Sequence, residues 1–152
     1  ERQRNYARAA NKRSVYTPQM VIAGEDHVVG NRPADVQGNL SKNSGQGNHI
    51  DLDVARNGDR LTIELSSETS GRDPMVVQVV RYSPKETRNI KRGENAGRTL
   101  SYHNIVTSWE EVGTWNGRRD KTISTRVPGD EPVVVIVQRE GFGPIMAAAE
   151  IR

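Results

Sequence analysis

The strongest constraint on the fold is a pair of alternating segments joined by Asn57-Gly58. In residues 50–54 and again in residues 61–65, apolar side chains occupy every second position. A period of two places these apolar side chains on one face of a β-ribbon. We expect Asn57-Gly58 to form the turn, because a type I′ turn needs positive φ at both central residues. The turn predicts the pairs Val54–Leu61, Leu52–Ile63 and Ile50–Leu65.

Short strand-like segments continue along the chain at intervals typical of a β-sandwich. The further strands are expected at residues 75–82, 86–92, 99–109, 120–127, 132–139 and 144–151. The run Val133-Val134-Val135-Ile136-Val137 has no polar alternation, which predicts a central strand covered on both faces. Residues 147–149 are alanines with high helix propensity, but a glycine-rich turn just before this segment favours a closing strand.

The first 45 residues carry a different pattern. Residues 1–13 indicate a basic helix, and residues 33–42 a second helix that begins with a proline in its first turn. Two short strands are expected between them, at 19–23 and 27–30. Residues 41–48 lack apolar side chains and contain two glycines, which predicts a linker. We therefore divide the chain into domains at residues 1–45 and 46–152.

The distribution of charged and apolar residues limits the classes of partner. The net charge of +3 comes from 22 basic and 19 acidic residues that are mixed along the chain, without the sustained basic block typical of nucleic-acid binding. The basic residues of the first helix are interpreted as its wet face, with an anion- or nucleic-acid-binding arm as the alternative. No apolar run approaches the roughly 20 residues that cross a bilayer. The sequence therefore predicts neither a nucleic-acid partner nor a membrane span.

Residues 16–30 carry a more specific signal. A Thr17-Pro18 step precedes an apolar run, Gly24 turns the chain, and a second apolar run ends at Gly30. This is the layout of the hairpin in the second half of a thioredoxin fold, where a cis proline faces a redox dithiol. We expect the Thr17-Pro18 bond to be cis, although only about 5–6% of X-Pro bonds in folded proteins are. The alternative is an ordinary proline that begins an edge strand.

The chain contains no cysteine. A dithiol–disulfide cycle needs a thiolate as nucleophile, so we expect no disulfide reductase activity from these residues alone. The three histidines, His27, His49 and His103, are far apart in sequence, and no structural zinc site is expected without cysteine. The sequence also lacks a Gly-x-Ser-x-Gly nucleophile elbow. We predict no catalytic residue, metal or cofactor.

The candidate binding residues lie in a polar block at residues 91–104. Its members are Arg92, Glu94, Asn95, Arg98 and His103. In one interpretation, Arg92 and Arg98 clamp a carboxylate or a phosphate bidentately. In the other, the block is an architectural hairpin whose glycines take special φ values, with Glu94 paired to an arginine and Asn95 capping backbone groups.

Two further pairs of side chains could carry chemistry. Asp51 and Asp53 share the strand face that we expect to point to solvent, and they are interpreted as its hydrophilic side rather than as an acid/base pair. Trp109 and Trp115 flank a short acidic segment. A sugar-stacking platform is one interpretation of the tryptophans, but we favour burial of at least one of them in the core.

The layout of residues 16–30 and the block KRGENAGRTLSYHN at 91–104 resemble an uncharacterised family of bacterial secreted proteins. Its members join a thioredoxin-like domain to a β-rich C-terminal domain. The resemblance implies an α+β N-terminal part, the second half of a thioredoxin-like fold, followed by an all-β, sandwich-like domain. It also implies a periplasmic or secreted location, and it places Thr17 and Pro18 where that family faces its substrate.

In that family a Cys-x-x-Cys-Pro-Pro motif lies upstream, so the resemblance implies that this chain is a fragment that begins after the motif. The parent would then be a thioredoxin-like protein of unestablished function, with thiol–disulfide oxidoreductase as the implied activity. The implied partners are the missing N-terminal half or a second chain, and a peptide or protein substrate. The alternative is a non-catalytic binding or interaction module that uses the β-domain.

Overall fold

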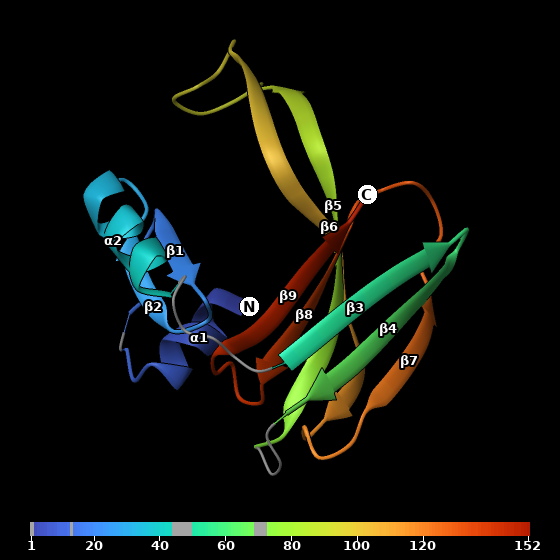
Figure 1. The fold of residues 1–152 in the computed structure, drawn as a ribbon. Helices are drawn as coiled ribbons and strands as arrows, with labels where there is room; N and C mark the ends of the chain where they lie inside the picture. The colour runs from blue at the N-terminus through green and yellow to red at the C-terminus, as the bar shows by residue number, and fades with distance from the viewer. Residues whose placement is uncertain (1, 13, 44–49, 69–72) are drawn as a thin grey trace.

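Two antiparallel sheets face each other in the computed structural model, which describes residues 2–12, 14–43, 50–68 and 73–152. One sheet has the order β3-β4-β7, and the other has the order β6-β5-β8-β9 (Figure 1). Their strands are β3 (Ile50–Asn57), β4 (Arg60–Ser67), β5 (Met75–Asn89), β6 (Thr99–Trp115), β7 (Lys121–Arg126), β8 (Val133–Arg139) and β9 (Ile145–Ile151).

The core lies between these sheets. Alternate residues of β4 and β8 point inward, and Leu61, Ile63, Val133, Val135 and Val137 are fully buried. Strand β8 lies between β5 and β9, which confirms the predicted central position. The predicted cover on both faces is incomplete, because Val134 and Ile136 on the outer face are only half-buried. The other buried members of the core are Ile50, Leu65, Met75, Val77, Val79, Trp115, Ile123, Val127 and Met146. The prediction that at least one tryptophan is buried is therefore also confirmed.

The hairpin of β3 and β4 turns one residue later than predicted. Asn57 pairs with Arg60, so Gly58 and Asp59 are the two central residues. Gly58 has a φ of +57°, and positive φ at the first central position fits a type II′ turn. The resulting pairs include Val54–Ile63, Leu52–Leu65 and Ile50–Ser67. The predicted register is thus wrong by two positions, but a shift of two leaves the same side chains on the core face.

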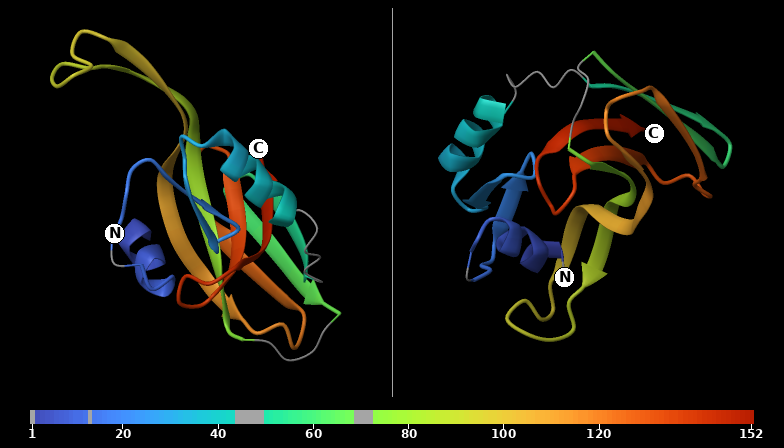
Figure 2. Two further views of the ribbon diagram at one scale, coloured as in Figure 1. Left: turned by 90° about the vertical axis from the view of Figure 1, so that its left-hand side faces the viewer. Right: turned by 90° about the horizontal axis from the view of Figure 1, so that it is seen from below.

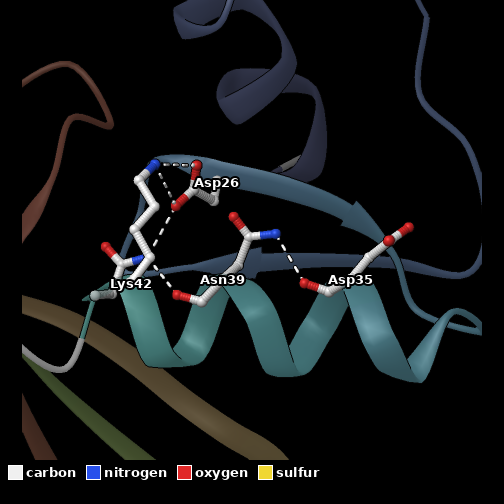
Figure 3. A network of polar contacts seen from close by, with 5 residues as sticks. Asp26, Asp35, Asn39 and Lys42 are labelled. Carbon is white, nitrogen blue, oxygen red and sulfur yellow. Dashed lines mark hydrogen bonds and ion pairs between the residues drawn. The ribbon is translucent and has the colours of Figure 1, made fainter.

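The N-terminal segment forms a small layered unit. Strands β1 (Gln19–Ile22) and β2 (Asp26–Val29) pair with each other. Helix α1 (Arg2–Ala9) lies on one face of this hairpin, where Gln3 Nε2 donates to Gln19 Oε1 at 2.8 Å. Helix α2 (Pro33–Asn43) lies on the other face and is joined to Asp26 of β2 (Figure 3).

The predicted fold class is wrong. Strands hold 54% and helices 14% of the described residues, in three antiparallel sheets, rather than an α+β thioredoxin-like half followed by a separate all-β domain. The N-terminal unit contacts the sandwich directly: Ile145 N donates to Ala23 O at 2.7 Å, and Gln138 of β8 contacts Tyr6 of α1. These contacts join residues more than 120 positions apart, which no local pattern predicts. The predicted boundary at residues 45 and 46 lies outside the described residues.

Strands β5 and β6 are longer than predicted. The sequence suggested separate strands at 75–82 and 86–92, but β5 runs without interruption from Met75 to Asn89. Pro84 interrupts a strand pattern, yet it is tolerated here because β5 has only β6 as a neighbour beyond Arg81. Residues 83–106, which we call the arm, project away from both sheets (Figures 1 and 2).

Candidate functional site

The arm is a two-stranded ribbon without a covering layer. Strand β8 pairs with β5 from Met75 to Arg81, and beyond Arg81 the strands β5 and β6 pair only with each other. Within the described part of the chain, both long edges of the arm therefore lack a strand partner. Free N–H and C=O groups on such an edge are a template for pairing with another extended segment.

One face of the arm carries three apolar side chains of β6 beside charged side chains of β5. The register places Tyr102 opposite Glu86, Leu100 opposite Arg88 and Val106 opposite Tyr82. Leu100, Tyr102 and Val106 therefore share a face with the ion pair of Glu86 and Arg88. Tyr102 is 41% and Val106 49% exposed. This face continues the outer face of the four-stranded sheet, which Trp109 and Tyr82 also line. The arm thus offers exposed apolar side chains, interspersed with polar ones, on a face that begins at the body of the protein.

The arm carries positive charge. Its sequence holds five basic and two acidic residues, while basic and acidic residues balance in the rest of the chain. Arg88 forms an ion pair with Glu86 at 2.5 Å. The other cations, Lys85, Lys91, Arg92 and Arg98, are exposed and form no ion pair within the described ranges. The excess of three positive charges on the arm therefore equals the net charge of the whole chain, +3.

The tip of the arm holds most of the predicted binding residues. Its backbone is closed by Gly97 N, which donates to Ile90 O at 2.8 Å, and Gly93 and Gly97 have φ values of +87° and +83°. The side chains of Arg92, Glu94, Asn95 and Arg98 are exposed, with no side-chain hydrogen bond or ion pair among the residues that are described. The internal pairing of Glu94 and the cap from Asn95 are thus not observed, and the anion-binding role stays a prediction.

His103 does not join the two arginines. It lies opposite Lys85 on the face of the ribbon that Tyr102 does not share. Arg98 precedes the first residue of β6, Thr99, and the four positions from Thr99 to His103 correspond to about 13 Å at the rise of a β-strand. The predicted site is therefore divided between the tip and the polar face of the arm.

The Thr17-Pro18 bond is cis, as predicted. Both residues are exposed just before β1, and Gly30 N donates to Pro18 O at 2.9 Å. The chain has no cysteine, so a dithiol facing this proline would have to come from elsewhere. A substrate-facing role for Thr17 and Pro18 stays a prediction.

A cluster of acidic side chains lies on the outer face of the three-stranded sheet. Asp51, Asp53, Glu64 and Asp120 line a hollow of about 300 Å³ on the outer face of the three-stranded sheet, beside Lys121. Asp51 and Asp53 are exposed, as predicted. Within the described residues, no group of three or more histidine, aspartate and glutamate side chains could hold a metal ion. Nor does any described helix have the length and apolar character to span a membrane.

Sequence reasoning missed a buried polar network beneath α1. Gln78 of β5 and Gln138 of β8 are 5% and 1% exposed, and Gln78 Nε2 donates to Gln138 Oε1 at 3.4 Å. Trp109 Nε1 donates to Gln78 Oε1 at 2.5 Å. The available signal was a single glutamine at the end of the apolar run 133–137, because a polar side chain in a buried strand requires hydrogen-bond partners.

Two neighbouring side chains of β2, Asp26 and His27, have shifted pKa values. Asn43 Nδ2 donates to Asp26 Oδ2 at 2.8 Å and Lys42 Nζ lies 3.3 Å from Oδ1 (Figure 3). The hydrogen bonds from Asn43 and Lys42 hold the pKa of the Asp26 carboxyl below its ordinary value. Burial lowers the pKa of His27, and the charge of Lys12 lowers it further.

Comparison with known proteins gives a family without an assigned activity. The family model described as "Protein of unknown function (DUF1223)" matches residues 1–138. The chain is also similar to a protein from Agrobacterium tumefaciens whose crystal structure is known, with 25% identity and a TM-score of 0.78 over 99% of this chain and 68% of that chain. No curated protein sequence matches the chain. The predicted resemblance to an uncharacterised family is confirmed, whereas a thioredoxin-like role gains no support.

Proposed function

We propose that this chain, which belongs to the DUF1223 family of proteins of unknown function, is a binding module whose contact element is the arm. The observation that carries the proposal is that residues 83–106 leave the sandwich as a ribbon whose outer edges pair with no other described strand. The core of the protein is complete without them, since each buried core residue lies outside this range. The partner that fits the arm is an acidic protein segment in extended conformation.

The geometry supports a binding mode that adds a strand to the arm. An extended segment can pair with the free edge of β6, where backbone hydrogen bonds provide affinity and alternate side chains provide specificity. The exposed side chains of Tyr102 and Val106 would become partly buried against the added strand. Tyrosine is suited to this role because its ring buries a large area with few rotatable bonds.

The charge of the arm favours an acidic partner. Lys85, Lys91, Arg92 and Arg98 have no competing carboxylate among the described residues, so their charges are available to a partner. Arginine can hold a carboxylate with two parallel hydrogen bonds. Exposed charges also steer the encounter, and this contribution falls as salt screens it.

The test uses a fluorescein-labelled peptide of alternating glutamate and leucine, with fluorescence anisotropy as the measurement. We expect the intact chain to bind this peptide at low ionic strength and to release it as salt is added. An Arg92→Ala/Arg98→Ala variant should bind more weakly by roughly 1.5–3 kcal/mol for each arginine that bonds a carboxylate. Its melting temperature should change little, because both side chains are exposed and form no hydrogen bond or ion pair with other described residues.

The matched control is Arg4→Ala/Arg60→Ala, which removes the same charge from two exposed positions outside the arm. It should bind the peptide as the unmodified chain does. Tyr102→Ser should weaken binding without changing the salt dependence, and a lysine–leucine peptide should not bind. The proposal fails if the acidic peptide does not bind, or if the two double variants lose equal affinity.

A further inference from the structure

The guanidinium group of Arg2 is held against the outer face of the four-stranded sheet. Its Cζ atom lies 3.6 Å from the ring centroid of Trp109 and 5.2 Å from the centroid of Phe142. It also lies 5.2 Å from the ring of Tyr6, one turn further along α1. A cation within about 6 Å of an aromatic centroid is attracted to the face of the ring. Three aromatic rings therefore surround one cation.

Hydrogen bonds fix the orientation of the Trp109 and Gln138 side chains on the sheet. Trp109 Nε1 donates to Gln78 Oε1 at 2.5 Å, which fixes the indole ring. Gln138 Nε2 donates to Tyr6 Oη at 2.9 Å and to Gly143 O at 2.8 Å. Because both N–H groups of the Gln138 amide have acceptors, the orientation of this amide is fixed. Its Oε1 atom accepts from Arg2 Nη2 at 3.1 Å. A buried carbonyl oxygen is thus aimed at the cation.

The cation is bound without a carboxylate. Within the described residues Arg2 forms no ion pair, and its contacts are ring faces, the Gln138 amide and the hydroxyl of Tyr6. A planar, weakly hydrated guanidinium can stack on an indole and donate in its own plane at the same time. An ammonium group is strongly hydrated and has no plane to stack. The chemistry of these contacts therefore selects guanidinium over ammonium.

We propose that Trp109, Phe142 and Gln138 form a guanidinium-binding site, which Arg2 of the same chain occupies. The class of ligand is an arginine side chain or another monosubstituted guanidinium cation. Occupation by Arg2 fastens α1 to the sheet. This site lies on the outer face of the four-stranded sheet, outside the arm. It does not depend on the function proposed for the arm.

The experiment replaces the occupant and supplies a small ligand. In the Arg2→Ala variant, millimolar ethylguanidinium should raise the melting temperature in a saturable way and change the emission of Trp109. Ethylammonium at the same ionic strength should do neither. The unmodified chain should not respond to either cation, because Arg2 fills its site, and the Arg4→Ala variant is the matched control for loss of an exposed arginine of α1.

A second substitution tests whether the response comes from this site. Adding Trp109→Leu to Arg2→Ala should weaken the apparent affinity for ethylguanidinium roughly fivefold, the loss of one cation–π contact on a partly exposed ring. Arg2→Gln keeps a good helix former at this position and should give the same response as Arg2→Ala. If the Arg2→Ala variant does not fold, the Arg2→Gln variant is used in its place. An equal response to both cations, or an equal response in the unmodified chain, would overturn the proposal.

Discussion

The side-chain amide of Gln138 donates from Nε2 to the hydroxyl oxygen of Tyr6 at 2.9 Å, across 132 positions of sequence. Gln138 is 1% exposed, and the same amide also contacts Gly143, Gln78 and Arg2. One side chain of β8 therefore connects α1, β5 and the loop before β9. A buried amide with all its hydrogen bonds formed specifies how these elements are arranged.

Replacing Gln138 by leucine should destabilise the protein although leucine is apolar and similar in size. The change leaves the carbonyl of Gly143 and the amide of Gln78 without their partner, and each unsatisfied buried group costs about 1–3 kcal/mol. We expect a lower free energy of unfolding in urea titrations with an unchanged slope. Gln37→Leu, on the exposed face of α2, is the control. An unfolding midpoint equal to that of the unmodified chain would show that the network contributes nothing to stability.

Two glycines should respond in opposite directions to alanine. Gly24 has a φ of +80°, and a Cβ there would lie 2.7 Å from Gly143 O. Gly24→Ala should destabilise the protein by at least about 1–3 kcal/mol, the cost of a strained backbone position. Gly38 lies inside α2, and a Cβ there would meet no atom within 4 Å, so Gly38→Ala should stabilise the helix by roughly 0.5–1 kcal/mol. Thermal denaturation of both variants measures the difference, and a stabilised Gly24→Ala protein would contradict the close approach of the β1–β2 turn to the β8–β9 loop.

The N-terminal unit should loosen as the pH falls. His27 has a lowered pKa in the folded protein, so the unfolded chain binds the proton more readily. The stability that neutral His27 contributes is therefore fully present above the unfolded value of about 6.5 and is lost as the pH falls through the folded value. Asp26 also has a lowered pKa, and its contribution is lost in a more acidic window, below about 3.9.

Melting temperatures measured across the pH range should therefore fall in two stages. His27→Gln should remove the first stage. Asp26→Asn should reduce the acidic stage, to which Glu150 also contributes because hydrogen bonds from Tyr82 and Arg152 lower its pKa. His103→Gln is the control, because His103 is exposed on the arm. A pH profile that is the same in the His27→Gln and unmodified proteins would show that this histidine does not govern the first stage.

Much of the sandwich could be predicted because its strands carry their own signals. Alternation in residues 50–54 and 61–65 identified the core face, and the unbroken apolar run at 133–137 identified a central strand. The register of the first hairpin was wrong because Asn57-Gly58 and Gly58-Asp59 both allow a two-residue turn. Local sequence does not decide between these two turns. In the folded protein, β4 also pairs with β7 along its other edge, and this pairing fixes the position of β4.

The site was harder to predict because it depends on contacts between distant residues. Arg92 and Arg98 were recognised from their glycine neighbours, but nothing local showed that their loop ends a projecting ribbon. That property follows from where β8 stops pairing with β5, at Arg81. Likewise, Gln138 shows its importance only when Tyr6 and Arg2 are placed beside it. A sequence pattern identifies faces of elements, and tertiary structure decides which faces meet.

The β-sandwich should fold without the N-terminal unit. The members of the core between the two sheets lie between Ile50 and Met146, so deleting residues 1–45 removes none of them. The deletion does uncover Gln138 and Trp109 on the outer sheet face, and it removes the partners that Tyr6 and Arg2 provide. We therefore expect residues 46–152 to unfold cooperatively at a lower melting temperature than the complete chain. Near-ultraviolet circular dichroism from buried Trp115 reports whether the core is still ordered. Loss of this signal and of the cooperative transition would show instead that the N-terminal unit and the sandwich fold only together, as one domain.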